Sequence, residues 1–376
     1  MSITERQARM GLAALLPLAN WDLANLVATQ GAVEVWQQLR AMGRESGWGR
    51  KAAGLDLAQL AAATKACNAR FLIPGDEEWP EQIADLDRVS LSGMGAAPLG
   101  LWLRGAGTLP HPERAVAVVG ARAASAYGEH VSTQLAQDLA QAGYLVVSGM
   151  AFGIDAASHA GALAAGRPTL AVLACGVDLA YPLGNAQLMN RILADGLVVS
   201  EVPPGSRPLK ASFLARNRII AALAQGVVIV EAAARSGARN TVSWASELGR
   251  VVMAVPGPVT STLSITPNRL IRDQEAILVA DAKQVQALLA PLNTIPEAEL
   301  HGEPRPLDRL PGSLRSLREA VAIGEVVDAA ELSARTGMSI MECVAGAQEL
   351  AETGWLVQLA GAAWRLPKRA DRSVAH

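Results

Sequence analysis

Six short apolar runs that alternate with helical stretches constrain the fold of this chain most strongly. The runs are 115–119, 144–147, 169–173, 197–199, 227–230 and 251–255. Uninterrupted apolar runs are typical of strands that are buried on both faces, and regular alternation of such strands with helices gives a parallel sheet. The pattern predicts an α/β fold with a Rossmann-like, doubly wound and mostly parallel sheet.

The segments on either side of these runs predict further domains. Residues 1–68 read as short amphipathic helices broken by glycines, and we expect a small helical domain of the SAM or helix-hairpin-helix kind. The extended Rossmann-like core then covers 69–290. Residues 291–311 carry prolines and charges that cannot bury a core, so they form a linker. In 312–370, helices on both sides of a turn at Gly337, followed by two short strands, predict a winged-helix-like domain.

Composition excludes several classes of protein. The longest apolar runs are far shorter than the roughly 20 residues of a membrane helix, and the N-terminus has no targeting pattern, so we expect a soluble, cytoplasmic chain without membrane contact. The three cysteines have no partner at metal-ligand spacing, and we expect neither a metal nor a cofactor. A formal net charge of −2 means that any nucleic-acid site must be a local patch.

Two glycine-containing turns follow the first two predicted strands. Ligands of an open parallel sheet bind beyond the carboxyl ends of its strands. The first turn, "VVGARAASAYG", offers Gly120 and Arg122, and Ser125 can cap the next helix. The second turn, "SGMAFGIDAASH", places Gly149 and Gly153 before a helix whose free N–H groups can hold an anion. Both turns predict phosphate sites, although glycines there also serve packing.

The segment 200–223, "SEVPPGSRPLKASFLARNRIIAAL", gives the most specific signal. No acidic residue lies between Val202 and Val230, whereas the segment carries four cations, Arg207, Lys210, Arg216 and Arg218. Cations pair with phosphates, and the ring of Phe213 can stack on an unpaired base, which favours single-stranded over duplex nucleic acid. In the alternative, Phe213 fills the core and the arginines cap helices or pair with Glu201 and Glu231.

Three more loops belong to the same edge of the predicted sheet. The segment 231–241 places Ser236 and Gly237 before a helix, and 255–260 follows the last strand. In 174–185 we expect Asp178, Tyr181 and Pro182 to shape the loop rather than to contact a ligand.

Together these segments resemble the DNA processing protein A (DprA/Smf) family. The matching motifs are "VVGAR", "SGMAFGIDAASH", "CGVDLAYPLGN", "SEVPPGSRPLKASFLARNRIIAAL", "EAAARSG" and "GRVVMAVPGPV". The resemblance implies a homodimer that binds single-stranded DNA, protects incoming strands in natural transformation and helps load RecA recombinase. It maps the binding pocket onto Arg122, the turn 148–153, and Lys210, Phe213, Arg216, Asn217 and Arg218. Phe152 stands where the family often has a basic residue.

We therefore expect nucleic-acid contacts along this edge and no catalytic residue. The expected contact residues are Gly120, Arg122, Ser148, Gly149, Phe152, Gly153, Arg207, Lys210, Phe213, Arg216, Asn217, Arg218, Ser236 and Gly237.

Two other functions stay open. Related Rossmann-like folds include nucleotide-processing phosphoribohydrolases, but "PGPVTST" lacks the second glycine and the glutamate of their PGGxGTxxE signature. Asp155 and His159 share a helix face and could serve as a general acid and base, although a structural role is favoured for both. Alternatively, the C-terminal domain is the nucleic-acid reader; its helix "MSIMECVAGAQELAE" carries glutamates, which disfavours insertion into a DNA groove.

Overall fold

The computed structural model describes residues 3–15, 18–109, 114–290 and 306–368. These residues belong to two compact units, Met1–Thr294 and Ile295–His376. In the described part of the first unit, one nine-stranded sheet has the order β1-β4-β8-β7-β6-β5-β9-β10-β11. Its strands are β1 Ala69–Leu72, β4 Leu101–Arg104, β5 Ala115–Val119, β6 Leu145–Ser148, β7 Thr169–Leu173, β8 Leu197–Ser200, β9 Gly226–Ile229, β10 Val251–Ala254 and β11 Ile277–Leu278.

The sheet is parallel from β8 through β5 to β11, and two antiparallel strands extend it at one edge. β4 pairs antiparallel with β8, and β1 pairs antiparallel with β4. A separate hairpin joins β2 (Ser90–Leu91) to β3 (Met94–Gly95). Each of the six predicted strands is present with ends shifted by at most one residue. The predicted α/β fold with a mostly parallel sheet is therefore confirmed.

Helices cover both faces of this sheet. They are α6 Ala126–Gln141, α7 Ile154–Ala164, α8 Ala186–Asp195, α9 Lys210–Leu223, α10 Ala238–Glu247, α11 Ile265–Arg272 and α12 Ala282–Leu289. Successive side chains of a strand point to opposite faces. Accordingly, Ala115 and Ala117 of β5 pack in one cluster with α9 and α10, whereas Val116 and Val118 pack with α6, α7 and α12. This two-sided burial explains why the central strands are apolar throughout.

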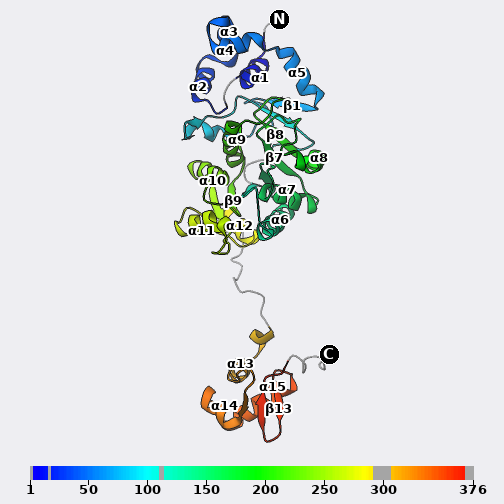
Figure 1. Cartoon of the computed structure of the whole chain (residues 1–376), viewed down its shortest axis with the longest axis vertical. Coiled ribbons are helices and arrows are strands. Elements are labelled where there is room, and N and C mark those ends of the chain that lie inside the picture. The colour runs from blue at the N-terminus through cyan, green and yellow to red at the C-terminus, as the bar shows by residue number, and fades with distance from the viewer. Residues whose placement is uncertain (1–2, 16–17, 110–113, 291–305, 369–376) are drawn as a thin grey trace. The chain divides into compact units, whose positions relative to one another are not determined.

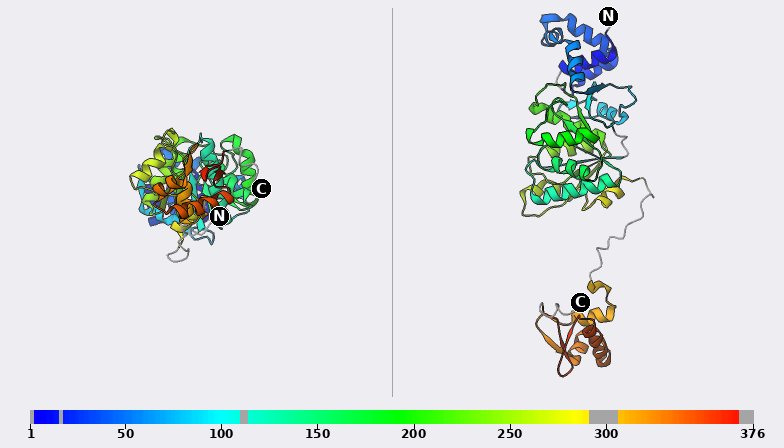
Figure 2. Two further views of the ribbon diagram at one scale, coloured as in Figure 1. Left: turned by 90° about the horizontal axis from the view of Figure 1, so that it is seen from below. Right: turned by 90° about the vertical axis from the view of Figure 1, so that its right-hand side faces the viewer.

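The N-terminal helices gather beyond the β1 edge of the sheet (Figures 1 and 2). They are α1 Glu5–Leu15, α2 Trp21–Gln30, α3 Ala32–Ala41, α4 Gly47–Gly54 and α5 Leu57–Ala66. Met10 of α1 and Leu60 of α5 share a hydrophobic cluster with Phe71 of β1 and Trp102 of β4. The expected helical domain at 1–68 is thus continuous with the core of the sheet rather than a separate body.

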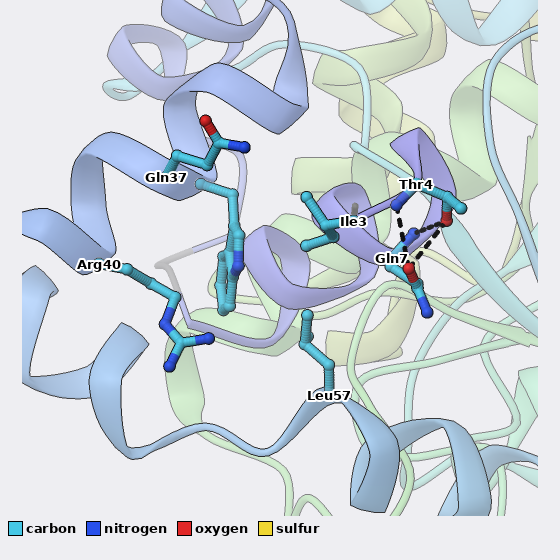
Figure 3. Close-up of a pocket in the computed structure, with 7 residues that line it drawn as sticks. Ile3, Thr4, Gln7, Gln37, Arg40 and Leu57 are labelled. Atoms are coloured by element: carbon cyan, nitrogen blue, oxygen red, sulfur yellow. Dashed lines mark hydrogen bonds between the residues drawn. The ribbon is translucent and has the colours of Figure 1, made fainter. Parts of the chain in front are cut away.

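A groove of about 740 Å³ lies among these helices (Figure 3). Its walls come from the start of α1, from α3 and from Leu57 of α5. Trp36 forms a buried, apolar part of the wall, and Arg40 is an exposed cation at its border.

The second unit contains helices and a small sheet of its own. Its elements are η6 Pro306–Arg309, α13 Gly312–Glu319, β12 Val326–Asp328, α14 Ala329–Thr336, α15 Ile340–Glu352, β13 Val357–Leu359 and β14 Ala363–Arg365. The strands are antiparallel in the order β12-β14-β13, and α14 ends at the expected turn, with Gly337 at φ +73°. The winged-helix-like assignment stays a proposal. The expected linker falls on 291–305, outside the described residues, and on η6.

Among the described helices, none is long and apolar enough to cross a bilayer.

Candidate nucleic-acid interface

A cavity of about 420 Å³ lies at the carboxyl ends of the strands, where the strand order reverses between β5 and β9. Five segments line it: the loop after β5, the turn from β6 into α7, helix α9, the loop from β9 into α10, and η5 (Thr262–Ser264) through Leu263. Such a reversal leaves a crevice in which open α/β sheets bind their ligands. The fold therefore brings together loops that are far apart in the sequence.

The loop after β5 is fixed by a buried carboxylate. Glu231, only 2% exposed, follows β9 and accepts hydrogen bonds from the Ser125 hydroxyl at 2.6 Å and the Ser125 amide at 2.9 Å. Ser125 in turn caps α6 through the Gly128 amide. Gly120 lines the cavity and Arg122 is exposed at its border. The negative charge at the start of α6 thus belongs to the protein itself, and Arg122 is the exposed cation of this loop.

The turn after β6 is likewise filled by a carboxylate of the chain. Asp155 accepts a hydrogen bond from the Gly149 amide at 3.2 Å, and the Ile154 amide donates to the Ala121 carbonyl at 3.1 Å. Two amides of this turn, those of Gly149 and Ile154, are therefore engaged within the protein, and the expected anion cradle stays a prediction for the rest of the turn. Gly153 starts α7 at φ +73°, and Phe152 is 49% exposed on the outside of the turn.

The prediction that the Ser148 side chain contacts nucleic acid is also wrong. It is fully buried, and its hydroxyl donates to the Val118 carbonyl at 2.6 Å, so it holds β6 to β5 rather than contacting a ligand.

Helix α9 divides its polar residues between surface and interior. Lys210, in its first turn, and Arg207, just before it, are exposed. Phe213 is half-buried and lines the cavity, where the Arg122 guanidinium lies 4.9 Å from the centre of its ring. This arrangement is a cation–π contact. Phe213 is thus neither a core residue nor free in solvent, and the surface beside it is cationic.

Arg218 does not reach this surface. It is 0% exposed, and its guanidinium donates to both carboxylate oxygens of Glu201 at 2.7 and 2.8 Å and to the Ala96 carbonyl at 3.1 Å. Buried charges in proteins are paired in this way. The expectation that Arg218 contacts nucleic acid is wrong, and the alternative in which it pairs with Glu201 holds.

Arg216 lies at the floor of the cavity, 7% exposed, beneath Gly149. A side chain at Gly149 would collide with its guanidinium, so this position requires glycine. Arg216 donates to the Val172 carbonyl at 2.7 Å. Burial lowers the pKa of Arg216 and raises that of Asp155, and the attraction between the two charges opposes both shifts. Arg216 therefore offers the cavity a buried charge held by a hydrogen bond, whereas Arg122 and Arg235 are exposed.

His159 lies behind this floor and not in the cavity. It is 0% exposed, its Nδ1 lies 2.7 Å from the Thr169 hydroxyl, and that hydroxyl donates to the Val146 carbonyl. Burial, with the charge of Arg216, lowers the pKa of His159 to about 3, so the ring is neutral. The geometry gives Asp155 and His159 structural roles.

The loop after β9 completes the cavity. Ser236 and Gly237 line it, and Asn217 of α9 holds the loop by donating to the Gly237 carbonyl at 3.3 Å and to the Asn240 side chain at 3.2 Å. Arg235, exposed at the cavity, was not among the expected contacts, although its place after a strand in "EAAARSG" marks it.

Comparisons with known proteins identify the family of the chain. The family model of DNA recombination-mediator protein A matches residues 70–290. A putative DNA processing protein DprA of Mycobacterium tuberculosis is 39% identical over 375 residues, which is 91% of both chains. The X-ray structure of DprA from Streptococcus pneumoniae is similar, with 31% identity, a TM-score of 0.63 and coverage of 76% of this chain and 98% of that one.

A second solved structure is that of DNA processing protein A from Helicobacter pylori, which is described as having a unique single-stranded DNA binding mode. It shows 27% identity, a TM-score of 0.51 and coverage of 59% of this chain and 95% of its own. The match of the family model across the α/β core, and the M. tuberculosis relative across nearly the whole length, establish the family. The chain therefore belongs to the DNA recombination-mediator protein A family, also called DprA or Smf, whose role is DNA processing.

Proposed function

We propose that this chain binds single-stranded DNA at the cavity between β5 and β9. The observation that carries the proposal is the pair of Arg122 and Phe213 at the cavity mouth, with the guanidinium 4.9 Å from the ring centre. An unpaired base can stack on such a ring while neighbouring cations hold its phosphates. Exposed Lys210 and Arg207 supply those cations. The single-stranded DNA binding described for the H. pylori relative supports the same assignment.

We further propose that the bound strand is passed to RecA recombinase by a homodimer of this chain in the cytoplasm. Membership of a recombination-mediator family supports this step. In this role the protein protects and delivers the strand, and no bond of the DNA is broken.

A phosphoribohydrolase function is less well supported. In that function the loop after β10 would offer free N–H groups to a phosphate. Here Gly257 donates its amide to the Asn268 side chain at 3.1 Å and accepts from it at 2.9 Å, while the Pro256 carbonyl accepts from the Tyr127 hydroxyl. The Gly257 amide is thus already engaged by a side chain of α11.

The C-terminal domain is also a weaker candidate for the DNA site. Helix α15 exposes Glu342, Glu349 and Glu352. Carboxylates repel a DNA backbone, so contact with protein fits this helix better.

Fluorescence anisotropy with a labelled oligo-dT strand at several salt concentrations tests the proposal. Lys210→Ala should weaken binding and reduce the slope of log affinity against log salt by roughly 0.7, the contribution of one phosphate contact on a single strand. Arg167→Ala is the matched control, because Arg167 is an exposed arginine just before β7. It therefore lies at the amino end of that strand, whereas the cavity lies at the carboxyl ends. Equal affinity for duplex and single strands, or an unchanged slope in Lys210→Ala, would contradict the proposal.

A further inference from the structure

Hydrogen bonds join three loops beside the cavity into one surface: the turn after β6, the loop after β7 and the loop after β8. Asn185 donates to the Met150 carbonyl at 2.9 Å and thereby joins the loop after β7 to the turn after β6. On the other side, the Gly205 amide donates to Asp178 at 2.9 Å and the Gly176 amide donates to the Ser206 carbonyl at 3.0 Å. Met150 has φ +58°, a conformation that costs a non-glycine residue of order 1–3 kcal/mol and persists only where its surroundings impose it. The shape of this surface is therefore set before any ligand binds.

Two aromatic rings stand on this surface. Tyr181 is 44% exposed and its ring centre lies 5.6 Å from that of Phe213. Phe152 is 49% exposed and rests on Gly184, where an added Cβ would come within 2.9 Å of the ring. The chain has only three phenylalanines and three tyrosines, so three of these six rings converge on one edge of the sheet. Leaving half of such a ring in water forgoes the stabilisation of burying it, which indicates a partner.

Exposed cations lie on the same segments as Phe213 and the loop that Asp178 anchors. Arg122 lies against Phe213, and Arg207 and Lys210 are exposed in and after the loop that Asp178 anchors. The Asp178 carboxylate is itself engaged by the Gly205 amide. Flat apolar rings beside exposed cations match a strand of unpaired bases joined by phosphates, because every base has a face that can stack.

We propose that Tyr181, together with Phe152, forms a second base-stacking platform that receives the nucleotides leaving the cavity past Phe213. This inference rests on the proposed function, since the ligand is the same single strand. Sequence reasoning assigned Tyr181 to shaping its loop, whereas the structure places its ring beside Phe213 and open to solvent. The stacked bases are read by their faces alone, so the platform lengthens the site without adding a sequence preference.

The test compares oligo-dT strands of two lengths, about three and about twelve nucleotides, by anisotropy. Tyr181→Ala should bind the longer strand at least about fivefold more weakly and the shorter one as the wild type does. Tyr181→Phe should restore binding, since it keeps the ring. Leu183→Ala, which trims an 80% exposed apolar side chain in the same loop, should leave both affinities unchanged. If Tyr181→Ala fails to fold, Tyr181→Leu gives the same reading, because leucine fills space without a ring.

The outcomes separate this inference from the proposed function. Wild-type affinity of Tyr181→Ala for both strands, together with weakened binding by Phe213→Ala, overturns the platform and leaves the cavity site standing. Failure of the wild-type protein to bind either strand overturns both. If light scattering shows that Tyr181→Ala changes the oligomeric state while each subunit keeps its affinity, the rings are a contact between copies and the platform is again overturned.

Discussion

The cavity at the carboxyl edge of the sheet and the groove among the N-terminal helices differ in chemistry more than in size. The groove is the larger, about 740 Å³ against about 420 Å³, yet it brings a single arginine, Arg40, among apolar and amide side chains (Figure 3). The cavity brings three arginines, from α9 and from the loops after β5 and β9. Volume alone would favour the groove over the proposed site. Converging cations on loops that hydrogen bonds hold in place identify the better one.

The cavity region is also marked by where the carboxylates of the chain lie. In the cavity region, carboxylates of the chain occupy two helix starts, through Glu231 and Asp155. The exposed cations Arg122 and Lys210 are therefore the phosphate-binding groups of the proposed site. The four predictions below run from the largest expected effect to the smallest.

The largest effect should come from the buried ion pair beneath the surface. Glu201→Gln removes the charge partner of Arg218, which is 0% exposed, and should lower the free energy of unfolding by about 3–5 kcal/mol. Urea denaturation followed by circular dichroism measures this loss. The folded fraction should keep its affinity for oligo-dT, because Arg218 does not reach the ligand.

Glu78→Gln is the control for that variant. The Arg70–Glu78 pair has the same chemistry but both side chains are 36% exposed, so its loss should cost at most about 1 kcal/mol. Equal destabilisation of the two variants would contradict the structural role assigned to Arg218.

Helix α9 shows how far the sequence alone can predict this site. Composition marks Arg207, Lys210, Arg216 and Arg218 equally, as one acid-free patch. The four side chains differ in exposure because α9 packs between the sheet and the segment Glu81–Arg88. The third turn of the helix is therefore buried, while its first turn is largely exposed. Which face of a helix is buried on two sides depends on tertiary packing, and a helix whose inner positions include two arginines gives no apolar stripe to predict it.

The sheet likewise contains strands that the sequence predicts and strands that it does not. Its central strands were predictable because burial on both faces demands continuous apolar runs, as in Thr169–Leu173. The edge strand Ile277–Leu278 is too short to leave a pattern, and the antiparallel pairing of β1 with β4 depends on partners distant in the chain. The closeness of Tyr181 to Phe213 could not be predicted for a similar reason, since only the folded loops bring the two rings together.

Phe213→Ala should weaken binding of oligo-dT by about 1–3 kcal/mol, the usual contribution of a ring that stacks on a base. The ring is half-buried at the cavity mouth, so the variant should remain folded. Anisotropy titration measures the affinity and thermal unfolding checks the fold. Phe213→Trp, which keeps a stacking face, should retain most of the affinity. Unfolding of Phe213→Ala at ordinary temperature would instead assign the ring to the core.

Arg122→Ala should reduce the salt slope by roughly 0.7 and weaken binding moderately, because it removes one phosphate contact and the cation over Phe213. Arg122→Lys should restore the slope but less of the affinity, since an ammonium group stacks less well than a planar guanidinium. Titrations at several salt concentrations distinguish the two. A slope that does not change in Arg122→Ala would mean that the strand passes the cavity without touching the loop after β5.

The smallest effect should come from the larger concavity. Arg40→Ala removes the cation at the groove of the N-terminal helices, and we expect the affinity for oligo-dT to stay within about 0.5 kcal/mol of the wild type with an unchanged salt slope. Arg40 is exposed, so the fold should tolerate the change. If Arg40→Ala lowered the slope as much as Arg122→Ala does, the strand would extend over the N-terminal helices. The contrast between a cavity with three arginines and a groove with one would then be a difference between two parts of one interface.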